Sequence, residues 1–199
     1  MMHPHTRLEW INDKKGFGVI ATQMIPKGTI TWVQDQLDIV FLQKDADELN
    51  PITREAFEKY SFRNSAGEYI LCWDLAKYVN HSFKSNCLST AYNFEIAVRD
   101  IQIGEELTDD YGYLNISEEF IPEDEGVERK AVQPDDILKC YKEWDLDLER
   151  VFPLILDIAQ PLYQLLSESV QQEIRKITSG DKKMLSTKNL YFMPEKSRI

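Results

Sequence analysis

Short runs of strand-forming residues, separated by turn residues, fill the first 110 positions and limit the folds open to this chain. Residues 7–11 alternate polar and apolar side chains, as a strand with one buried face does. Gly16 and Gly18 punctuate the connection to the next run, and Pro26 and Gly28 mark another turn. Similar runs follow at residues 31–33, 37–41, 69–73, 88–91, 94–98 and 106–108. Because these runs do not alternate with helical patterns, the sequence predicts a mostly β fold without parallel βαβ units.

Helical patterns are expected in two places. The first is a short insert at about residues 45–62, where Asn50 is placed to cap a helix that begins at Pro51. The second lies near the C-terminus, where apolar residues recur every three or four positions. The predicted organisation therefore has four parts: a β domain at residues 6–114, an acidic and mobile linker at 115–133, a helical extension at 134–180, and a tail at 181–199.

Charge, hydropathy and cysteine spacing disfavour several classes of function. The formal net charge is −11, and sequence-independent nucleic-acid binding depends on Lys and Arg, so no direct nucleic-acid partner is expected. No run of 18 apolar residues is present, which predicts no membrane span, and the N-terminus lacks the apolar core of a signal peptide. We therefore expect an intracellular protein, cytoplasmic or, in a eukaryotic host, nuclear. Cys72, Cys87 and Cys140 are far apart, which predicts neither a metal site nor a disulfide framework.

Acidic residues dominate one part of the chain. Residues 100–128 contain eleven Asp and Glu side chains and no Lys or Arg. A solvated acidic surface accounts for this run. Alternatively, the run attracts a basic protein segment and steers it toward a site.

Two segments carry most of the functional information. They are Tyr78-Val79-Asn80-His81-Ser82-Phe83-Lys84-Ser85-Asn86-Cys87 and Gly104-Glu105-Glu106-Leu107-Thr108-Asp109-Asp110-Tyr111-Gly112-Tyr113. Together they resemble the two signature segments of the SET-domain protein-lysine methyltransferases, over about residues 6–114. The resemblance implies a SET-type (β-clip) fold in which the two segments meet in a knot-like crossing. It also implies methyl transfer from S-adenosylmethionine (SAM) to a lysine ε-amine of a basic protein, with S-adenosylhomocysteine as the other product.

The resemblance assigns roles to particular residues. Tyr111 matches the family's catalytic tyrosine, which orients the amine and also lies beside SAM. Asn80 and His81 match the SAM-contacting pair, and the turn Gly16-Phe17-Gly18 matches a glycine-containing turn that contacts SAM through its backbone. Tyr113, two residues after Tyr111, would point to the same side of an extended strand and line the lysine channel. Asp109 is a further candidate for the channel. Tyr69 and Tyr78 are weaker candidates, and core packing is the better interpretation of each.

The sequence departs from the family pattern at two points. Phe83 stands where many histone-directed members have a zinc-binding cysteine, and no C-x-C follows, so a zinc-free member is expected. In its place the C-terminal helices would close the lysine channel, form a homodimer interface, or pack as a plain layer. Asp109 stands where aromatic or apolar residues are common, and a carboxylate there either favours the ammonium form of lysine or points to solvent. The alternative function is a catalytically weak SET-like module that binds basic segments.

Overall fold

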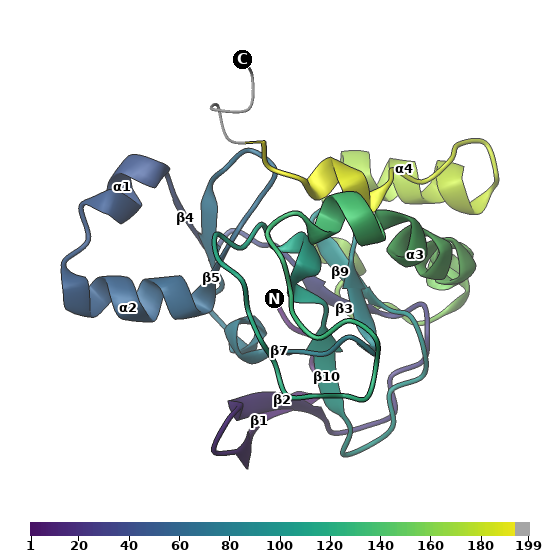
Figure 1. Cartoon of the computed structure of the whole chain (residues 1–199). Helices are drawn as coiled ribbons and strands as arrows, with labels where there is room; N and C mark the ends of the chain where they lie inside the picture. Colours follow the sequence, from purple (N-terminus) through teal and green to yellow (C-terminus); the bar gives the residue numbers. More distant parts are fainter. Residues whose placement is uncertain (194–199) are drawn as a thin grey trace.

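In a computed structural model, which describes residues 1–193, the first half of the chain forms three small β-sheets (Figure 1). The first sheet has the order β1-β2-β10-β7 and contains Thr6–Asn12, Gly16–Ala21, Glu106–Asp109 and Asn80–His81. The second has the order β3-β9-β8 and contains Ile30–Val33, Phe94–Ala97 and Cys87–Ser89. The third has the order β4-β6-β5 and contains Ile39–Phe41, Tyr69–Leu71 and Ser61–Arg63. Every neighbouring pair is antiparallel except β10 and β7.

The β1–β2 hairpin follows directly from its turn residues. The Oδ1 atom of Asn12 accepts hydrogen bonds from the backbone N–H groups of Lys14 and Lys15, at 2.8 and 2.9 Å. Gly16 then adopts a φ of +74°, a conformation that side chains with a Cβ atom disfavour. Strand β2 continues into the core, with Val19 to Ala21 buried, and pairs on its other edge with β10.

The insert between the strands of the third sheet contains two helices where the sequence predicted one. Helix α1 spans Gln43–Asp47 and α2 spans Pro51–Tyr60. As expected, Asn50 caps α2: its side chain accepts a hydrogen bond from the Thr53 backbone N–H at 3.0 Å. The short helix α1 escaped sequence analysis because its five residues show no complete apolar period. The two helices project to one side of the molecule in Figure 1.

The C-terminal helices share a hydrophobic core with the second sheet. The helices are α3 (Asp136–Val151) and α4 (Glu168–Thr178). Short 3₁₀ segments occur at η1 (Leu75–Tyr78), η2 (Tyr111–Tyr113), η3 (Phe152–Asp157), η4 (Tyr163–Leu165) and η5 (Thr187–Leu190). Phe94 of β9 packs against Phe152 of η3, with ring centroids 6.0 Å apart, and Ile174 of α4 is completely buried in the same cluster. These helices therefore form a packing layer of the domain (Figure 1).

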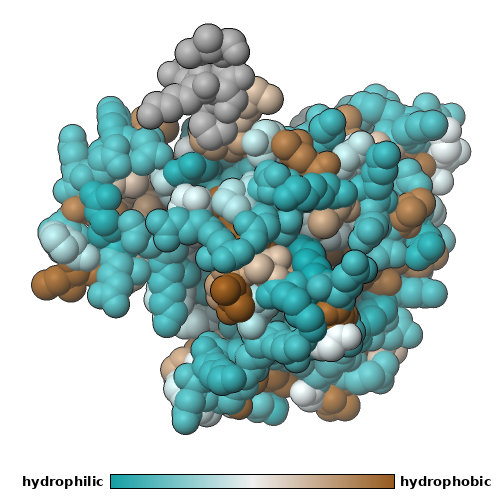
Figure 2. Space-filling view, in the orientation of Figure 1, coloured by the Kyte–Doolittle hydropathy of each residue, from teal (hydrophilic) through white to brown (hydrophobic). Residues whose placement is uncertain are grey.

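The C-terminal tail docks onto α3 at least as far as η5. Thr187 is fully buried, and its backbone N–H and hydroxyl donate to Asp145 Oδ1 at 2.7 and 2.8 Å. Residues 194–199, the end of the predicted tail, lie outside the described residues. Within residues 1–193 no helix is long and apolar enough to cross a membrane. Figure 2 shows a face covered mainly by hydrophilic residues, with hydrophobic side chains scattered among them.

Candidate active site

The two sequence motifs lie side by side in the first sheet. Strands β7 and β10 run parallel, with Asn80 opposite Thr108 and His81 opposite Asp109. The backbone N–H of Ser82 extends this pairing by donating to the Asp109 carbonyl at 2.9 Å. Residues about 30 positions apart in the chain are thereby fixed beside one another by main-chain hydrogen bonds.

Asn86 holds the crossing of the two motifs together. Its side chain is completely buried, and its Oδ1 atom accepts a hydrogen bond from the Thr108 N–H at 2.9 Å. Its Nδ2 group donates to the Glu106 carbonyl at 2.8 Å. One amide side chain thus satisfies a donor and an acceptor of β10, which explains why the second part of the first motif requires an asparagine.

A cavity of about 980 Å³ opens beside this crossing. Its size is typical of sites that enclose a cofactor or a small ligand. Residues of both motifs line it, together with side chains from all three sheets and from the segment after β10: Asn80, His81, Asp109, Tyr111, Trp32, Glu95, Ser89, Tyr69, Cys72 and Phe120.

Tyr111 is held by two hydrogen bonds at the wall of the cavity. Its hydroxyl donates to the Val79 carbonyl at 2.8 Å, and its backbone N–H donates to Nδ1 of His81 at 3.1 Å. Burial raises the pKa of the Tyr111 phenol, and the negative charge of Asp109 adds to that increase. The phenol therefore remains protonated, with oxygen lone pairs free to accept a hydrogen bond from an amine.

His81 is a neutral, buried imidazole. Burial lowers its pKa to about 4. Because Nδ1 accepts the hydrogen bond from Tyr111, the ring proton resides on Nε2, which is buried and has no hydrogen-bond partner. Aromatic rings surround the imidazole: Phe83 with centroids at 4.4 Å, Tyr111 at 5.3 Å and Phe120 at 5.8 Å.

Asn80 connects the first motif to the glycine-containing turn. Its Nδ2 group donates to the Phe17 carbonyl at 3.0 Å and to Glu106 Oε1 at 2.7 Å, and Lys15 Nζ contacts Glu106 Oε2 at 3.0 Å. A Cβ atom on Gly18 would lie 2.5 Å from Glu106 Oε1 and 3.0 Å from Asn80 Nδ2. Gly18 is therefore required because these two side chains pack directly on its backbone.

Residues 115–133, which we name the strap, lie across the two motifs (Figure 1). Glu125 accepts hydrogen bonds from the Ser82 hydroxyl and the Phe83 N–H, both at 3.0 Å. The backbone groups of Phe120 and Val132 bond to each other at 3.0 and 2.8 Å, which closes the strap into a loop. Phe120 and its neighbours in the strap contribute to the cavity wall.

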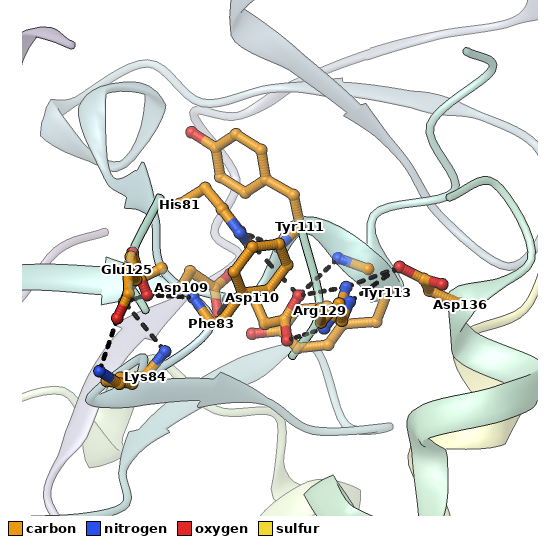
Figure 3. A network of polar contacts seen from close by, with 12 residues as sticks. His81, Phe83, Lys84, Asp109, Asp110, Tyr111, Tyr113, Glu125, Arg129 and Asp136 are labelled. Atoms are coloured by element: carbon orange, nitrogen blue, oxygen red, sulfur yellow. Dashed lines mark hydrogen bonds and ion pairs between the residues drawn. The ribbon is translucent and has the colours of Figure 1, made fainter. Parts of the chain in front are cut away.

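Arg129 fastens the end of the strap to the second motif and to helix α3 (Figure 3). Its guanidinium group contacts Asp110 at 2.6 and 3.0 Å and Asp136 at 2.7 and 3.1 Å. Both carboxylates are buried, and the guanidinium carbon lies 4.7 Å from the centroid of the Phe83 ring. Gly112 leaves room for this arrangement, since a Cβ atom there would lie 2.5 Å from Arg129 Nη2.

Asp109 and Glu95 form a pair of carboxyl groups in the cavity wall. Both side chains line the cavity, and each perturbs the ionisation of the other. Burial raises the pKa of Glu95 to about 7. Burial, followed by the charges of Glu95 and Asp110, also raises the pKa of Asp109 well above its ordinary value. Asp109 is 3% exposed, so it does not point to bulk solvent.

Comparison with known protein families shows which family this architecture represents. The SET-domain profile matches residues 16–112, a segment that includes both motifs and their crossing. The chain carries a SET domain. The domain has the SET-type fold of short strands expected from the sequence, with a C-terminal helical extension, and the SET family is one of protein methyltransferases.

Among solved structures, the SET-domain chain is similar to a Plasmodium falciparum candidate histone methyltransferase. The two are 16% identical, with a TM-score of 0.41, over 55% of this chain and 95% of that one. A comparison with curated proteins found no match. Within residues 1–193, no group of three or more His, Cys, Asp or Glu side chains is arranged to hold a metal ion.

The structure brings most of the residues predicted for the site to the cavity, but not all of them. Asn80, His81, Asp109, Tyr111 and Tyr69 line it. The residues of the predicted Gly16-Phe17-Gly18 turn do not line it. The Phe17 carbonyl accepts a hydrogen bond from Asn80, and the preceding Lys14 and Lys15 line the cavity instead.

The structure corrects the prediction for Tyr113. This residue is 2% exposed and outside the large cavity, and it packs edge-to-face on Trp144 with centroids 5.1 Å apart. The prediction assumed an extended strand, in which residues two apart share a face. The chain instead turns through η2 at Tyr111, so the two tyrosines diverge, and Tyr113 accepts a hydrogen bond from the Ser89 N–H at 3.1 Å.

Several residues of the site escaped sequence analysis. Glu95 lay in a predicted strand, and the alternation of that strand gave no sign that this acid faces a cavity. Phe120 and Glu125 lay in a segment expected to be a mobile linker. The acidic run itself is heterogeneous: Asp109 and Asp110 are buried, while Glu105 and Glu106 form ion pairs with Arg99 and Lys15. The exposed acids at the cavity, Glu118 and Glu123, correspond to the solvated or steering surface that the sequence indicated.

Proposed function

We propose that this protein is a SAM-dependent protein-lysine N-methyltransferase. The observation that carries the proposal is the convergence of Asn80, His81 and Tyr111 on one cavity of about 980 Å³ at the crossing of the two SET motifs. When bound, SAM would supply a methyl group on a sulfonium centre for transfer to a nucleophile.

The residues present fit such a cofactor. The Nε2–H group of His81 is a buried donor without a partner in the protein, as expected for a group that a ligand satisfies. Phe120 and Tyr111 present two aromatic rings with centroids 5.6 Å apart, and Asn80 and His81 lie beside them. We propose that Asn80, His81 and Phe120 hold SAM, with the strap covering it.

Tyr111 is proposed to orient the lysine amine. Its hydroxyl proton is committed to the Val79 carbonyl, so the phenol oxygen can accept an N–H hydrogen bond from the amine. This fixes the direction of the nitrogen lone pair, and alignment of this kind can contribute about 7–11 kcal/mol to a displacement reaction. The amine must also be neutral, although a free lysine has a pKa of about 10.4 and is almost fully charged at pH 7.

The proposed substrate is a lysine in a basic protein segment. The net charge of −11 and the exposed acids Glu118 and Glu123 at the cavity wall would attract such a segment. Lys14, Lys15 and Arg63 also lie at the wall, so charge alone does not define the path of the substrate.

The test compares two tyrosines of one short segment. We expect Tyr111→Phe to lower methyl transfer to lysine-rich peptides by at least about 100-fold, while SAM binding measured by calorimetry is retained. Tyr113→Phe is the matched control, because its ring packs in the core outside the large cavity, and it should keep most of the activity. Asn80→Ala should weaken SAM binding.

The outcomes separate the enzyme from its alternative. Wild-type protein that does not bind SAM would refute the proposal. Wild-type protein that binds basic peptides without transferring methyl groups would favour the catalytically weak binding module. Incubation of host lysate with labelled SAM, followed by mass spectrometry and with Tyr111→Phe as the control, would identify the methylated protein.

A further inference from the structure

Residues of the second sheet form part of the wall of the cavity. Glu95 in the middle strand β9 lies opposite Trp32 of β3 and Ser89 of β8. Residues paired across a sheet share a face, and all three line the cavity. Asp109 lines the same cavity from β10, and its ionisation is linked to that of Glu95. Ser89 Oγ lies 3.4 Å from Glu95 Oε1.

The surroundings leave this carboxyl pair without a basic partner. Within residues 1–193, neither Glu95 nor Asp109 forms an ion pair with a lysine or arginine. Most ionisable groups whose charge affects the pKa of the pair, or whose own pKa the pair affects, are acids. They are Asp110, Tyr111, Cys72 and Cys87, and the Met1 ammonium is an opposing charge. Two carboxyl groups in such surroundings do not both ionise readily, so the pair can carry a single negative charge and keep one proton.

An independent feature indicates that a polar ligand completes this wall. Trp32 is 4% exposed, and its indole Nε1–H has no hydrogen-bond partner. Burying a donor without a partner is unfavourable, so a donor of this kind in a cavity wall is a suitable partner for a polar ligand. His81 Nε2–H presents a second such donor in the same cavity.

We propose that the Glu95–Asp109 pair is the general base of the reaction and takes a proton from the substrate ammonium before methyl transfer. This inference rests on the proposed function. Tyr111 cannot take that role, because its phenol stays protonated and donates to the Val79 carbonyl. Asp110 cannot either, because Arg129 holds both of its oxygens.

The singly charged pair binds the –NH₃⁺ group, one N–H bond breaks, and its proton joins the carboxylate, which leaves –NH₂ and two neutral carboxyl groups. The amine lone pair then forms the N–C bond as the S–C bond of the sulfonium donor breaks, and the donor departs as a neutral thioether. The product is a methylated ammonium, and the pair returns its extra proton to solvent.

The proposal also explains why Asp109 need not oppose the reaction. A fully ionised carboxylate would stabilise the ammonium form of lysine. The raised pKa of the pair makes it a stronger proton acceptor than an ordinary carboxylate, and proton transfer removes two opposite charges from a buried site.

The test measures single-turnover methyl transfer to a lysine peptide as a function of pH. We expect Glu95→Gln to reduce the rate at pH 7 by about 100-fold or more, and to leave a rate that keeps rising with pH as the free amine loses its proton. A peptide in which thialysine, whose amine is less basic, replaces lysine should recover much of the loss. Asp109→Asn should also lower the rate of methyl transfer at pH 7.

Asp38→Asn is the matched control. Asp38 is 8% exposed, and burial also raises its pKa, but it lies outside the cavity and accepts backbone hydrogen bonds from Asp35 and Trp73. Its pH–rate profile should equal that of the wild type. A Glu95→Gln profile that coincides with the wild-type profile would overturn the proposal.

A second measurement does not depend on activity or on a variant that folds. Carboxyl ¹³C NMR of the wild type should show Glu95 and Asp109 titrating together, and adding the lysine peptide should lower their apparent pKa, because the ammonium stabilises the charged form. An unchanged midpoint would refute the role of the pair. Wild-type protein that fails to methylate lysine at all would instead refute the proposed function.

Discussion

Removing the Arg129 guanidinium is the perturbation with the largest calculable effect on the site. This group bridges Asp110 of the second motif and Asp136 of helix α3, with four nitrogen–oxygen distances between 2.6 and 3.1 Å. Its two partners are 3% and 4% exposed. Arg129→Ala would therefore leave two carboxylates buried without a counter-charge.

The expected loss follows from the burial of those carboxylates. Removing one partner of a buried ion pair costs about 3–5 kcal/mol, mainly because the remaining charge cannot be solvated. The Arg129 side chain is 23% exposed, so water can partly replace it, and we expect the lower end of the range, about 3 kcal/mol. That corresponds to a factor of about 100 in the folding equilibrium constant.

Urea unfolding measures this loss directly. With a slope of about 1–3 kcal/mol per molar for a small protein, the midpoint should fall by about 1–3 M. Lys130→Ala is the matched control, because Lys130 and Asp124 form an ion pair with side chains 56% and 68% exposed, and its midpoint should not change. The urea midpoint of Arg129→Lys should lie between those of the wild type and Arg129→Ala, since a lysine ammonium cannot reproduce the paired hydrogen bonds of the planar guanidinium.

An Arg129→Ala urea midpoint equal to that of the Lys130→Ala control would refute this role of Arg129. A further variant separates charge from packing, because the guanidinium also lies against the Phe83 ring. In an Arg129→Met background, neutralising both carboxylates with Asp110→Asn and Asp136→Asn should recover part of the stability. No recovery would assign the loss to packing.

Three further expectations concern pH, backbone space and the helical layer. His81 has a folded-state pKa of about 4, below its ordinary value of 6.5, so the unfolded state binds the proton more tightly and stability is lost as pH falls from about 6.5 to 4. Between pH 7 and 5 the free energy of unfolding of the wild type, measured by chemical denaturation, should fall by about 2 kcal/mol more than that of His81→Asn. Equal losses would contradict a neutral buried imidazole. Gly18→Ala should displace the Asn80–Glu106 contact and lower the free energy of unfolding by about 1–3 kcal/mol. It should also weaken SAM binding measured by calorimetry. Unchanged binding would show that this contact does not support the proposed cofactor site. Ending the chain at residue 133 should abolish soluble expression, because Phe94 and its neighbours would lose the helical layer that covers them. Ending the chain at residue 193 should not. A soluble, cooperatively folded protein of residues 1–133 would refute this prediction.

Much of the β domain was predictable because local signals and the fold agree. The Asn12 turn with Gly16, the Asn50 cap and the short apolar runs each specify their structure within a few residues. The two motifs could be recognised as a pair because their residue types match a known pattern. Asn86 shows the physical reason for one such residue, since its amide satisfies two backbone groups of β10.

The errors arose where a local rule was extended across a change of backbone. Tyr113 was assigned to the channel by the two-residue period of a strand, but η2 begins at Tyr111. The strap was expected to be a mobile linker because it is acidic and rich in turn residues. The contacts that join Glu125 and Arg129 to the two motifs are with residues 19 to 43 positions away, a range that no local pattern records.

The sequence by itself determined the elements that depend on near neighbours: the turns, the caps, the strand runs and the paired motifs that carry Asn80, His81 and Tyr111. Only the tertiary structure decided what surrounds them. The pKa values of Glu95 and Asp109 are raised because both groups are removed from water and because strands from two different sheets bring the two acids to one cavity. Burial and the proximity of charges set the ionisation of side chains, and both are properties of the folded chain.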